Sequence, residues 1–398
     1  MKEKIIPTVV IKKGRAKPLF YGHPWVFSGA VEKVKGEPAD GDPVTVIDHE
    51  GRLIGSGFYN SHSQITVRII GQGATAGAPA DFIAILSGKI AGAVSARKIA
   101  GLPSAETTGF RLFFSEGDRL SGLTVDVYEK ACVVILSAYY LYKRSGAIID
   151  ALKRLLDPET ICVRIEKGAD EGIGRDEIIE FTGPDIPSVR FMENGVVYET
   201  DLKRGQKGGF YFDQRENRLL LRRFAREKNV LDAFCYTGGF SLNAALAGAG
   251  SVAAIDTSLP ALDMAKKNAA LNGCGRVDFQ QADAYSFLGA AKKDFYDVIV
   301  IDPPKMLHKE GDRTNALKKY ISLNALAISA IRKGGILFTC SCSQKISRED
   351  FFHILREAAH QTGRSVSILS AAGAGADHPV LPCFPEGEYL KCFVCRVA

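Results

Sequence analysis

From Asn229 onward the chain alternates short apolar segments with helical patterns, and this alternation restricts the fold more than any other feature. Five apolar segments are each followed by a helical pattern: 229–232, 251–256, 277–281, 296–302 and 335–340. Such alternation is typical of a doubly wound, mostly parallel sheet, because each helix returns the chain to begin the next parallel strand. Segments 365–369 and 388–397 flank a long loop without a helix, so we expect them to be antiparallel neighbours. This part of the chain is predicted to be an α/β domain that ends in antiparallel pairing.

Two smaller modules precede this sheet. Strand-like segments separated by turn residues predict an all-β module at the start: 7–12, 43–48, 53–59 and 64–70. The small, turn-rich stretch 71–80 is the best candidate linker. The following residues mix helical patterns with strand-like segments and predict an α+β domain: 81–100 and 144–156 as helices, 122–128, 131–138 and 160–166 as strands. The predicted domains are 1–72, 73–190 and 191–398.

Composition excludes several classes of protein. The chain has 398 residues, 46% hydrophobic and 24% charged, which is globular usage rather than that of a disordered chain. No uncharged apolar run approaches the roughly 20 residues of a membrane helix, and the start lacks the apolar core of a signal peptide. We therefore expect a cytoplasmic protein with no membrane partner. Nine cysteines, an odd number, then favour reduced thiols over a disulfide framework.

The net charge of +6 is modest, but the charge is unevenly distributed. Residues 1–20 contain six basic side chains against one acidic, and residues 203–228 contain nine against three. Two basic patches in different parts of the chain suit a polyanion such as RNA that contacts both. Two solvated faces are the alternative interpretation.

Acidic residues follow successive strands of the predicted α/β sheet. Asp232 closes the first strand, Asp256 closes the second, and Asp283 comes just after the third. Ligands of such sheets bind beyond the carboxyl ends of the strands, where Asp256 could accept from ribose hydroxyls and Asp283 could face an adenine. The alternative for each acid is a helix N-cap. The turn 233–240 contains Gly238 and Gly239 but lacks G-x-G-x-x-G, so a nucleoside without phosphates, S-adenosylmethionine above all, fits better than a dinucleotide.

Two motifs near the ends of later strands carry the candidate chemistry. Asp302-Pro-Pro-Lys305 follows the fourth strand, where the prolines fix a turn that can aim the carboxylate at a planar substrate. Cys340 and Cys342 end the fifth strand and would share one side if the strand persists. They could be two buried small side chains, a metal site, for which no zinc-type spacing is present, or a nucleophilic thiol.

A nucleophilic thiol would explain the pairing with an acid. Addition of a thiolate to C6 of a pyrimidine makes C5 able to attack a sulfonium methyl group, while an acid supplies a proton near N3. A thiol with an unperturbed pKa near 8.5 is only a few per cent thiolate at neutral pH, so nearby positive charge should help. Lys305 is the candidate for that charge.

Other notable residues are predicted to be structural. Cys392-Phe-Val-Cys395 lies in an apolar terminal segment with no preceding βα turn, so we interpret it as packing. The seven histidines share no spacing and are interpreted as structural or surface residues. Trp25 could stack on a base or pack inside the small β module, and both interpretations stay open.

With these motifs in order, the chain resembles the RlmI-type 23S rRNA (cytosine-C5)-methyltransferases over essentially its whole length. The matching segments are 13–15, 22–29, 205–217, 232–239, 302–305, 341–343 and 384–391, of which 205–217 is the most specific. The resemblance implies an N-terminal PUA domain, a central α+β domain and a C-terminal Rossmann-like class I methyltransferase domain. It also implies S-adenosylmethionine as cofactor, S-adenosylhomocysteine as product, large-subunit rRNA as partner, no metal, and a possible homodimer.

The resemblance also assigns roles to residues. It implies that Cys342 is the nucleophile and Asp302 the acid, with Lys305 beside them. It implies a set of cofactor-binding residues: Gln214, Arg215, Asp232, Phe234, Cys235, Tyr236, Thr237, Gly238, Gly239, Asp256, Asp283 and Asp302. The family has no second cysteine in the D-P-P motif, so another, unnamed base must remove the C5 hydrogen.

Two positions depart from the family pattern. Position 208 is Gly where the family usually has Thr, which removes a hydroxyl and adds backbone freedom. Met306 stands where an aromatic residue is common after D-P-P-Lys. Two other functions remain open at this point: methylation of a guanine or an exocyclic amine without a covalent step, and a non-catalytic RNA-binding assembly protein.

Overall fold

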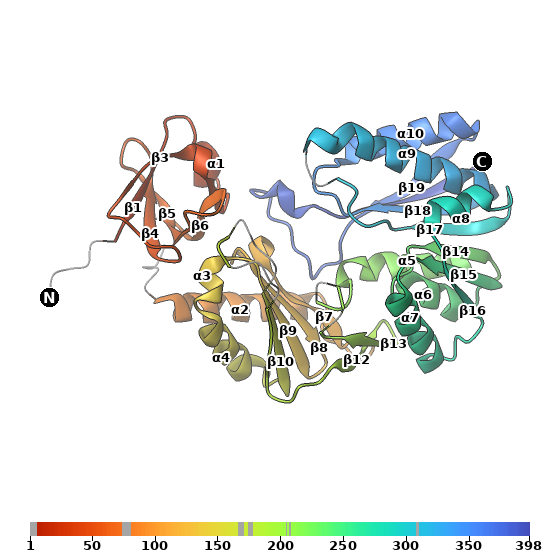
Figure 1. Ribbon diagram of the computed structural model, residues 1–398, viewed down its shortest axis with the longest axis horizontal. Coiled ribbons are helices and arrows are strands. Elements are labelled where there is room, and N and C mark those ends of the chain that lie inside the picture. Colours follow the sequence, from red (N-terminus) through yellow and green to blue (C-terminus); the bar gives the residue numbers. More distant parts are fainter. Residues whose placement is uncertain are drawn as a thin grey trace. The chain divides into compact units, whose positions relative to one another are not determined.

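A computed structural model describes residues 6–73, 81–165, 171–173, 178–203, 205–206, 208–307 and 310–398 (Figure 1). The chain divides into two compact units. Unit 1 comprises Met1–Val189, Asp201–Phe210 and Ala376–Gly387, and unit 2 comprises Arg190–Thr200, Tyr211–Gly375 and Glu388–Ala398. The domain boundaries expected from the sequence stay predictions.

Unit 1 begins with a six-stranded sheet of strand order β2-β6-β5-β4-β1-β3. Its elements are β1 (Thr8–Ile11), α1 (Lys17–Phe20), β2 (Trp25–Phe27), β3 (Val31–Lys35), β4 (Pro43–Ile47), β5 (Leu53–Tyr59) and β6 (Ile65–Gln72). In β4 the buried positions are Val44 and Val46, and this alternation places every second side chain in the core of the module. The predicted all-β module is confirmed, with β2 and β3 as additional strands.

The second sheet of unit 1 has five strands in the order β11-β10-β9-β8-β7. Its elements are α2 (Phe82–Ile99), β7 (Gly109–Phe114), β8 (Leu123–Tyr128), β9 (Ala131–Leu136), α3 (Tyr139–Tyr142), α4 (Ser145–Leu156), β10 (Thr160–Ile165) and β11 (Ile178–Thr182). Helix α4 connects β9 to the parallel strand β10, and the other pairs are antiparallel. Every residue of β9 and β10 is buried, and the expected α+β arrangement is present.

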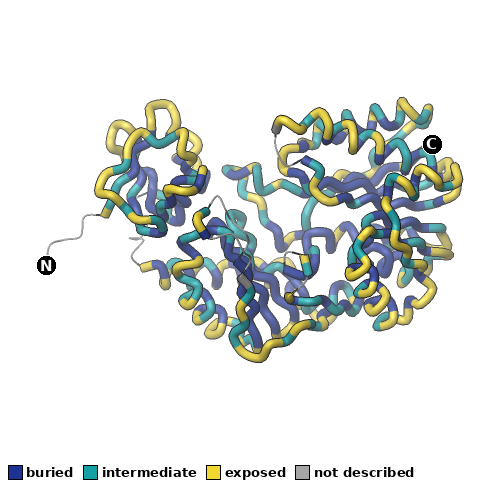
Figure 2. The backbone as a smooth tube through the Cα atoms, in the orientation of Figure 1, coloured by how far each residue is buried: buried dark blue, intermediate teal, exposed yellow. Residues whose placement is uncertain are grey.

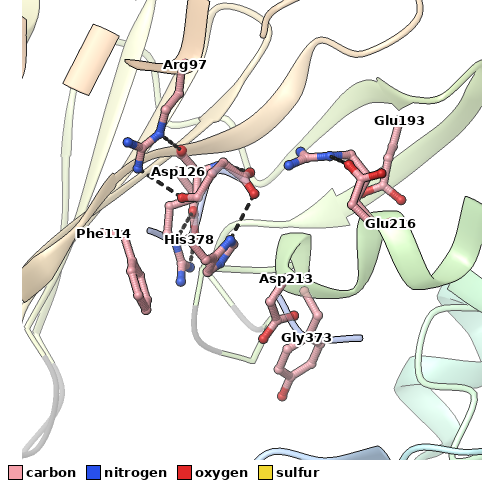
Figure 3. Close-up of polar contacts among 12 residues, drawn as sticks. Arg97, Phe114, Asp126, Glu193, Asp213, Glu216, Gly373 and His378 are labelled. Atoms are coloured by element: carbon pink, nitrogen blue, oxygen red, sulfur yellow. Dashed lines mark hydrogen bonds and ion pairs between the residues drawn. The ribbon is translucent and has the colours of Figure 1, made fainter. Parts of the chain in front are cut away.

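A segment from late in the sequence, Ala376–Gly387, belongs to unit 1. Its Asp377 carbonyl accepts a hydrogen bond of 2.9 Å from Arg97, which also forms a buried ion pair with Asp118. The ring of His378 lies 4.9 Å from that of Phe114 and its Nδ1 is hydrogen-bonded to Asp377, so His378 is a structural residue (Figure 3).

Unit 2 contains most of a hairpin and a seven-stranded sheet of order β16-β15-β14-β17-β18-β20-β19. The strands are β12 (Ser188–Glu193) and β13 (Val196–Asp201) of the hairpin, then β14 (Asn229–Ala233), β15 (Ser251–Asp256), β16 (Val277–Gln281), β17 (Tyr296–Ile301), β18 (Ile331–Ser341), β19 (Val366–Ala372) and β20 (Lys391–Val397). Strands β14 to β18 pair in parallel, and β20 pairs antiparallel with both β18 and β19. The predicted doubly wound sheet with an antiparallel end is confirmed.

Helices cover both faces of the sheet of unit 2 (Figure 1). They are α5 (Arg215–Ala225), α6 (Gly239–Leu246), α7 (Leu259–Leu271), α8 (Ala284–Ala290), α9 (Arg313–Ala330) and α10 (Arg348–Thr362). Helices α8, α9 and α10 contribute to one apolar core with the strands, while α5 contacts α6 and α6 contacts α7. The central strands are accordingly buried along most of their length (Figure 2). Among the described residues, no helix combines the length and apolarity needed to cross a membrane.

Parallel pairing brings the carboxyl ends of β14, β15, β17 and β18 to one edge of the sheet. Ala233 of β14 is in register with Ile255 of β15 and with Ile301 of β17, which in turn faces Thr339 of β18. The residues that follow these positions therefore meet at the same edge, where ligands of doubly wound sheets bind.

Candidate active site

The backbone of the turn after β14 is held in one conformation by left-handed residues and by hydrogen bonds to Asp256. Phe234, Tyr236 and Gly238 have φ values of 69°, 49° and 86°, in the left-handed region, and Gly238 is the N-cap of α6. Asp256 holds this turn because its Oδ2 accepts from the backbone N–H of Tyr236 at 2.9 Å. Its Oδ1 accepts from the N–H of Ser258, so the carboxylate ties the two strand ends together.

Two buried polar atoms beside this turn have no partner within the described residues: Asp232 Oδ1 and Thr237 Oγ1. The other oxygen of Asp232 accepts from the backbone N–H and hydroxyl of Ser241. Burial raises the pKa of Asp232 to about 6. Buried polar groups in native proteins are nearly always satisfied, so a polar ligand is expected here. The unsatisfied oxygens of Asp232 and Thr237 therefore fit polar groups of a ligand such as S-adenosylmethionine.

The other residues predicted to bind the cofactor differ in their burial and in their hydrogen-bond partners. Cys235 uses its backbone N–H to bond Ile255 O, and burial raises the pKa of its thiol, which makes the side chain inert. Asp283 is exposed and caps α8 by accepting from Ser286, so the N-cap interpretation holds for this acid. Its contact with an adenine stays a prediction. Arg215 is buried, with its Nε 3.6 Å from Glu216.

Asp302 follows β17 and is half-buried. Gln214 donates from Nε2 to Asp302 Oδ2 at 2.9 Å and is itself held by Asn217. Burial and the charge of Asp213 raise the pKa of Asp302 to about 7, against the smaller opposing effect of the Gln214 hydrogen bond. Asp302 therefore carries a proton in a substantial fraction of molecules at neutral pH, as a general acid requires.

The two cysteines of the fifth strand have different environments. Strand β18 ends at Ser341, so strand alternation does not extend to Cys342 and gives the two side chains no shared side. Cys340 is fully buried opposite Cys392, and burial raises the pKa of its thiol well above the usual value. Cys342 is half-buried just beyond the strand end. Of the two thiols, that of Cys342 is the more exposed.

Sequence reasoning missed the buried lysine of β20. Lys391 is in register with Ser341 and donates from Nζ to the backbone carbonyls of Ser343 and Tyr389. Lys391 begins an apolar strand pattern, so the pattern did not mark it. The one sequence signal for its importance was its place in the family-like segment 384–391. Lys305, expected beside the thiol, is exposed, and its role stays a prediction.

The residues interpreted as structural are confirmed where the structure describes them. Cys392 and Cys395 are both fully buried in β20. In unit 1, the Trp25 ring lies 4.6 Å from that of Phe384 and its Nε1 donates to Glu116, so it packs against residues outside the small β module rather than inside that module's core.

The basic segment 203–228 does not form one solvated face. Arg218 is buried in an ion pair with Glu193, and Arg222 bonds Asn243. Further cations surround a hollow of about 360 Å³ at the amino-terminal edge of the sheet, which we call the basic hollow: Arg223, Arg226, Lys228, Arg332 and Lys333, with Asp297 the one acid among the described lining residues. Three of them, Arg223, Lys228 and Lys333, have no carboxylate partner in the part of the chain that the structure describes.

Comparison with known proteins places this geometry in a family. Residues 9–72 match the model of a PUA-like domain, and residues 174–371 match that of an S-adenosylmethionine-dependent methyltransferase. The ribosomal RNA large subunit methyltransferase I of Klebsiella pneumoniae is 34% identical over 416 residues, with all of both chains covered. The chain belongs to the ribosomal RNA large subunit methyltransferase I family.

Other members and solved structures agree. The family member from Escherichia coli O9:H4 is 36% identical over 406 residues, covering 98% of this chain and 99% of its own. A solved methyltransferase structure in complex with SAH superimposes with a TM-score of 0.83 at 19% identity, over 98% of this chain and 100% of the other, which shows the same fold. As a methyltransferase I family member, the chain is an S-adenosylmethionine-dependent enzyme, and the predicted cofactor is confirmed.

Proposed function

We propose that this enzyme forms 5-methylcytosine in large-subunit rRNA through a covalent bond between Cys342 and the target base. The observation that carries the proposal is the pairing of two groups on neighbouring strands. The half-buried thiol of Cys342 follows β18, and Asp302, whose pKa is raised to about 7, follows β17. Cytosine C5 methylation needs one nucleophile and one acid, and these side chains supply both.

In the proposed reaction, the Cys342 sulfur bonds to C6 of cytosine while Asp302 gives its proton to N3, which makes C5 an electron-rich carbon. S-adenosylmethionine, when bound, supplies an electrophilic methyl group. A base then removes the C5 hydrogen, the bond from sulfur to C6 breaks, and the N3 proton returns to Asp302. Positions 303–305 are Pro-Pro-Lys, so no cysteine of this motif is that base.

The cofactor would lie against the turn after β14. Asp232 Oδ1 and Thr237 Oγ1 are buried atoms that need a polar partner, and Asp256 fixes the backbone between them. Gln214 contacts Asp302 directly, so it links the cofactor residues to the acid. In this proposal these residues bind and orient the cofactor.

The RNA would be held at two places. The PUA-like domain supports one contact, and the basic hollow supports a second through phosphate groups. Relatives at 34 to 36% identity are named as rRNA large subunit methyltransferases, which supports rRNA as the substrate. The cytoplasmic location, the homodimer and the domain boundaries at 72 and 190 stay predictions.

Replacing Cys342 with Ala tests the covalent route. We expect loss of 5-methylcytosine formation in large-subunit rRNA, measured by mass spectrometry of digested RNA, with S-adenosylmethionine binding retained in calorimetry. Cys383, a half-buried cysteine of unit 1, offers the matched control Cys383→Ala, which should leave the product unchanged. Full methyl transfer by Cys342→Ala would refute the covalent route and favour a guanine or exocyclic amine as the methylated group. Absence of cofactor binding by the wild-type chain would favour a non-catalytic RNA-binding protein.

A further inference from the structure

Lys391 is a cation in an interior position. Its relative exposure is 2%, and lysine is almost never buried to this extent unless it has a partner. Its Nζ donates to the carbonyls of Ser343 and Tyr389, each at 2.8 Å, and no ion pair to a carboxylate is formed within the described ranges. Two of its three N–H donors are used, and one is left over.

The position of this ammonium group is set by strand register. Lys391 begins β20 and faces Ser341, the last residue of β18, while its Nζ reaches the carbonyl of Ser343. The lysine side chain therefore runs from the level of Ser341 to the carbonyl of Ser343, along the three-residue segment that contains Cys342. The charge of Cys342 favours the protonated lysine, which indicates that the two groups interact electrostatically.

Two neutral carbonyls do not repay the burial of a full charge, because an ammonium group loses several kcal/mol of hydration in the interior. A thiolate beside the ammonium group would offset this loss of hydration. We propose that the ammonium group of Lys391 is a positioning group for Cys342 that favours the thiolate form of its sulfur. The proposal rests on the nucleophilic role of Cys342 put forward above.

The surrounding charges define the pH range in which this can operate. Burial lowers the pKa of Lys391 to about 8, while Glu388, next to β20, and Asp350, from α10, oppose that effect and Arg348 adds to it. Burial and, to a smaller extent, the charges of Asp302 and Cys342 raise the pKa of both Tyr211 and Tyr320, so these tyrosines belong to the same electrostatic environment. The lysine is charged below about pH 8, so its support for the thiolate is present at neutral pH and is lost as the pH rises through that value.

The test measures Cys342 itself in the full-length chain without RNA. Iodoacetamide alkylation of the peptide containing Cys342 is followed by mass spectrometry from pH 5.5 to 10 in the wild type, Lys391→Met and Lys391→Arg. In the wild type we expect the rate to reach half its plateau below pH 8.5, the value of an ordinary thiol. Lys391→Met should lower the rate at pH 7 about tenfold and move the midpoint up by about one pH unit. Lys391→Arg should restore most of the rate.

The controls separate this role from a structural one. Lys318→Met removes an exposed cation of α9 and should leave the profile unchanged. A lysine that only fastened the strand end would leave the midpoint where it is, so equal midpoints in wild type and Lys391→Met overturn the proposal. If Lys391→Met does not fold, a wild-type midpoint at or above pH 8.5 overturns the proposal equally. Alkylation of Cys342 does not depend on methylation, whereas the Cys342→Ala product assay does. Failure of the Lys391 proposal is therefore distinguishable from failure of the covalent route.

Discussion

Replacing Asp302 with Asn should reveal, through stability alone, how strongly the protein keeps this carboxyl protonated. Burial and the charge of Asp213 raise the pKa of Asp302 from 3.8 to about 7. Between pH 3.8 and about pH 7, Asp302 is protonated in the folded chain and ionised in the unfolded chain. The stability contributed by the protonated group is fully present below pH 3.8 and is lost as the pH rises through about 7. Asparagine does not titrate, so the variant lacks this loss.

The size of the change in unfolding free energy follows from the difference between the two pKa values of Asp302. A span of about three pH units at about 1.4 kcal/mol per unit gives at most about 4 kcal/mol in the free energy of unfolding. Asp302 is half-buried, so solvent screening reduces this upper limit. The free energy of unfolding of Asp302→Asn minus that of the wild type should therefore rise by a few kcal/mol from pH 4 to pH 7 and stay level above.

Urea unfolding followed by far-UV circular dichroism between pH 4.5 and 8.5 measures this difference. Asp232→Asn is the matched variant, because burial raises the pKa of Asp232 to about 6 and its curve should level about one unit earlier. A flat difference for Asp302→Asn across the whole range would refute the reasoning. Asp302 would then be ionised at neutral pH and unable to act as the acid.

Three further outcomes are expected. Gly208→Ala should lower the free energy of unfolding by about 1–3 kcal/mol in urea titrations, since its Cβ would collide with Asp126 Oδ2, and an unchanged midpoint would contradict this. Neutralising Arg223 and Lys333 together should reduce the slope of log affinity for rRNA fragments against log salt by about 1.5 while cofactor binding stays constant, and an unchanged slope would exclude the basic hollow as a phosphate contact. Thr237→Val should weaken S-adenosylmethionine binding in calorimetry about fivefold, and equal affinity would show that its buried hydroxyl does not meet the cofactor.

The sequence predicted the sheet of unit 2 well because its signal is local. Each apolar run of the parallel strands is followed by its own helix, and the acids near the carboxyl ends of β14 and β15 and directly after β17 meet at one edge by parallel register. Strand β18 begins at Ile331, before the predicted start at 335, where an irregularity in its pairing with β17 interrupts the pattern.

The features that could not be predicted from the sequence depend on contacts between residues far apart in the chain. Six of the seven residues of β20 are buried, because the strand lies between β18 and β19, so its pattern could not mark Lys391 as an interior cation. Segment Ala376–Gly387 joins unit 1 through contacts with residues far away in sequence, such as Arg97.

The departure at position 208 also has a spatial cause. A side chain there would collide with Asp126, which is fixed by an ion pair with Arg111. Gly208 is therefore explained by lack of space beside Asp126.

The central claim is that sulfur of Cys342 bonds to a cytosine ring, and a trapping measurement tests it most directly. Large-subunit rRNA containing 5-fluorocytidine keeps fluorine where the C5 hydrogen must leave, so elimination stops and the adduct persists. With S-adenosylmethionine present, the account predicts a protein–RNA band on a denaturing gel and a nucleotide mass on the Cys342 peptide. A wild-type chain that methylates normal rRNA at C5 but gives no such adduct, or an adduct on another residue, would contradict it.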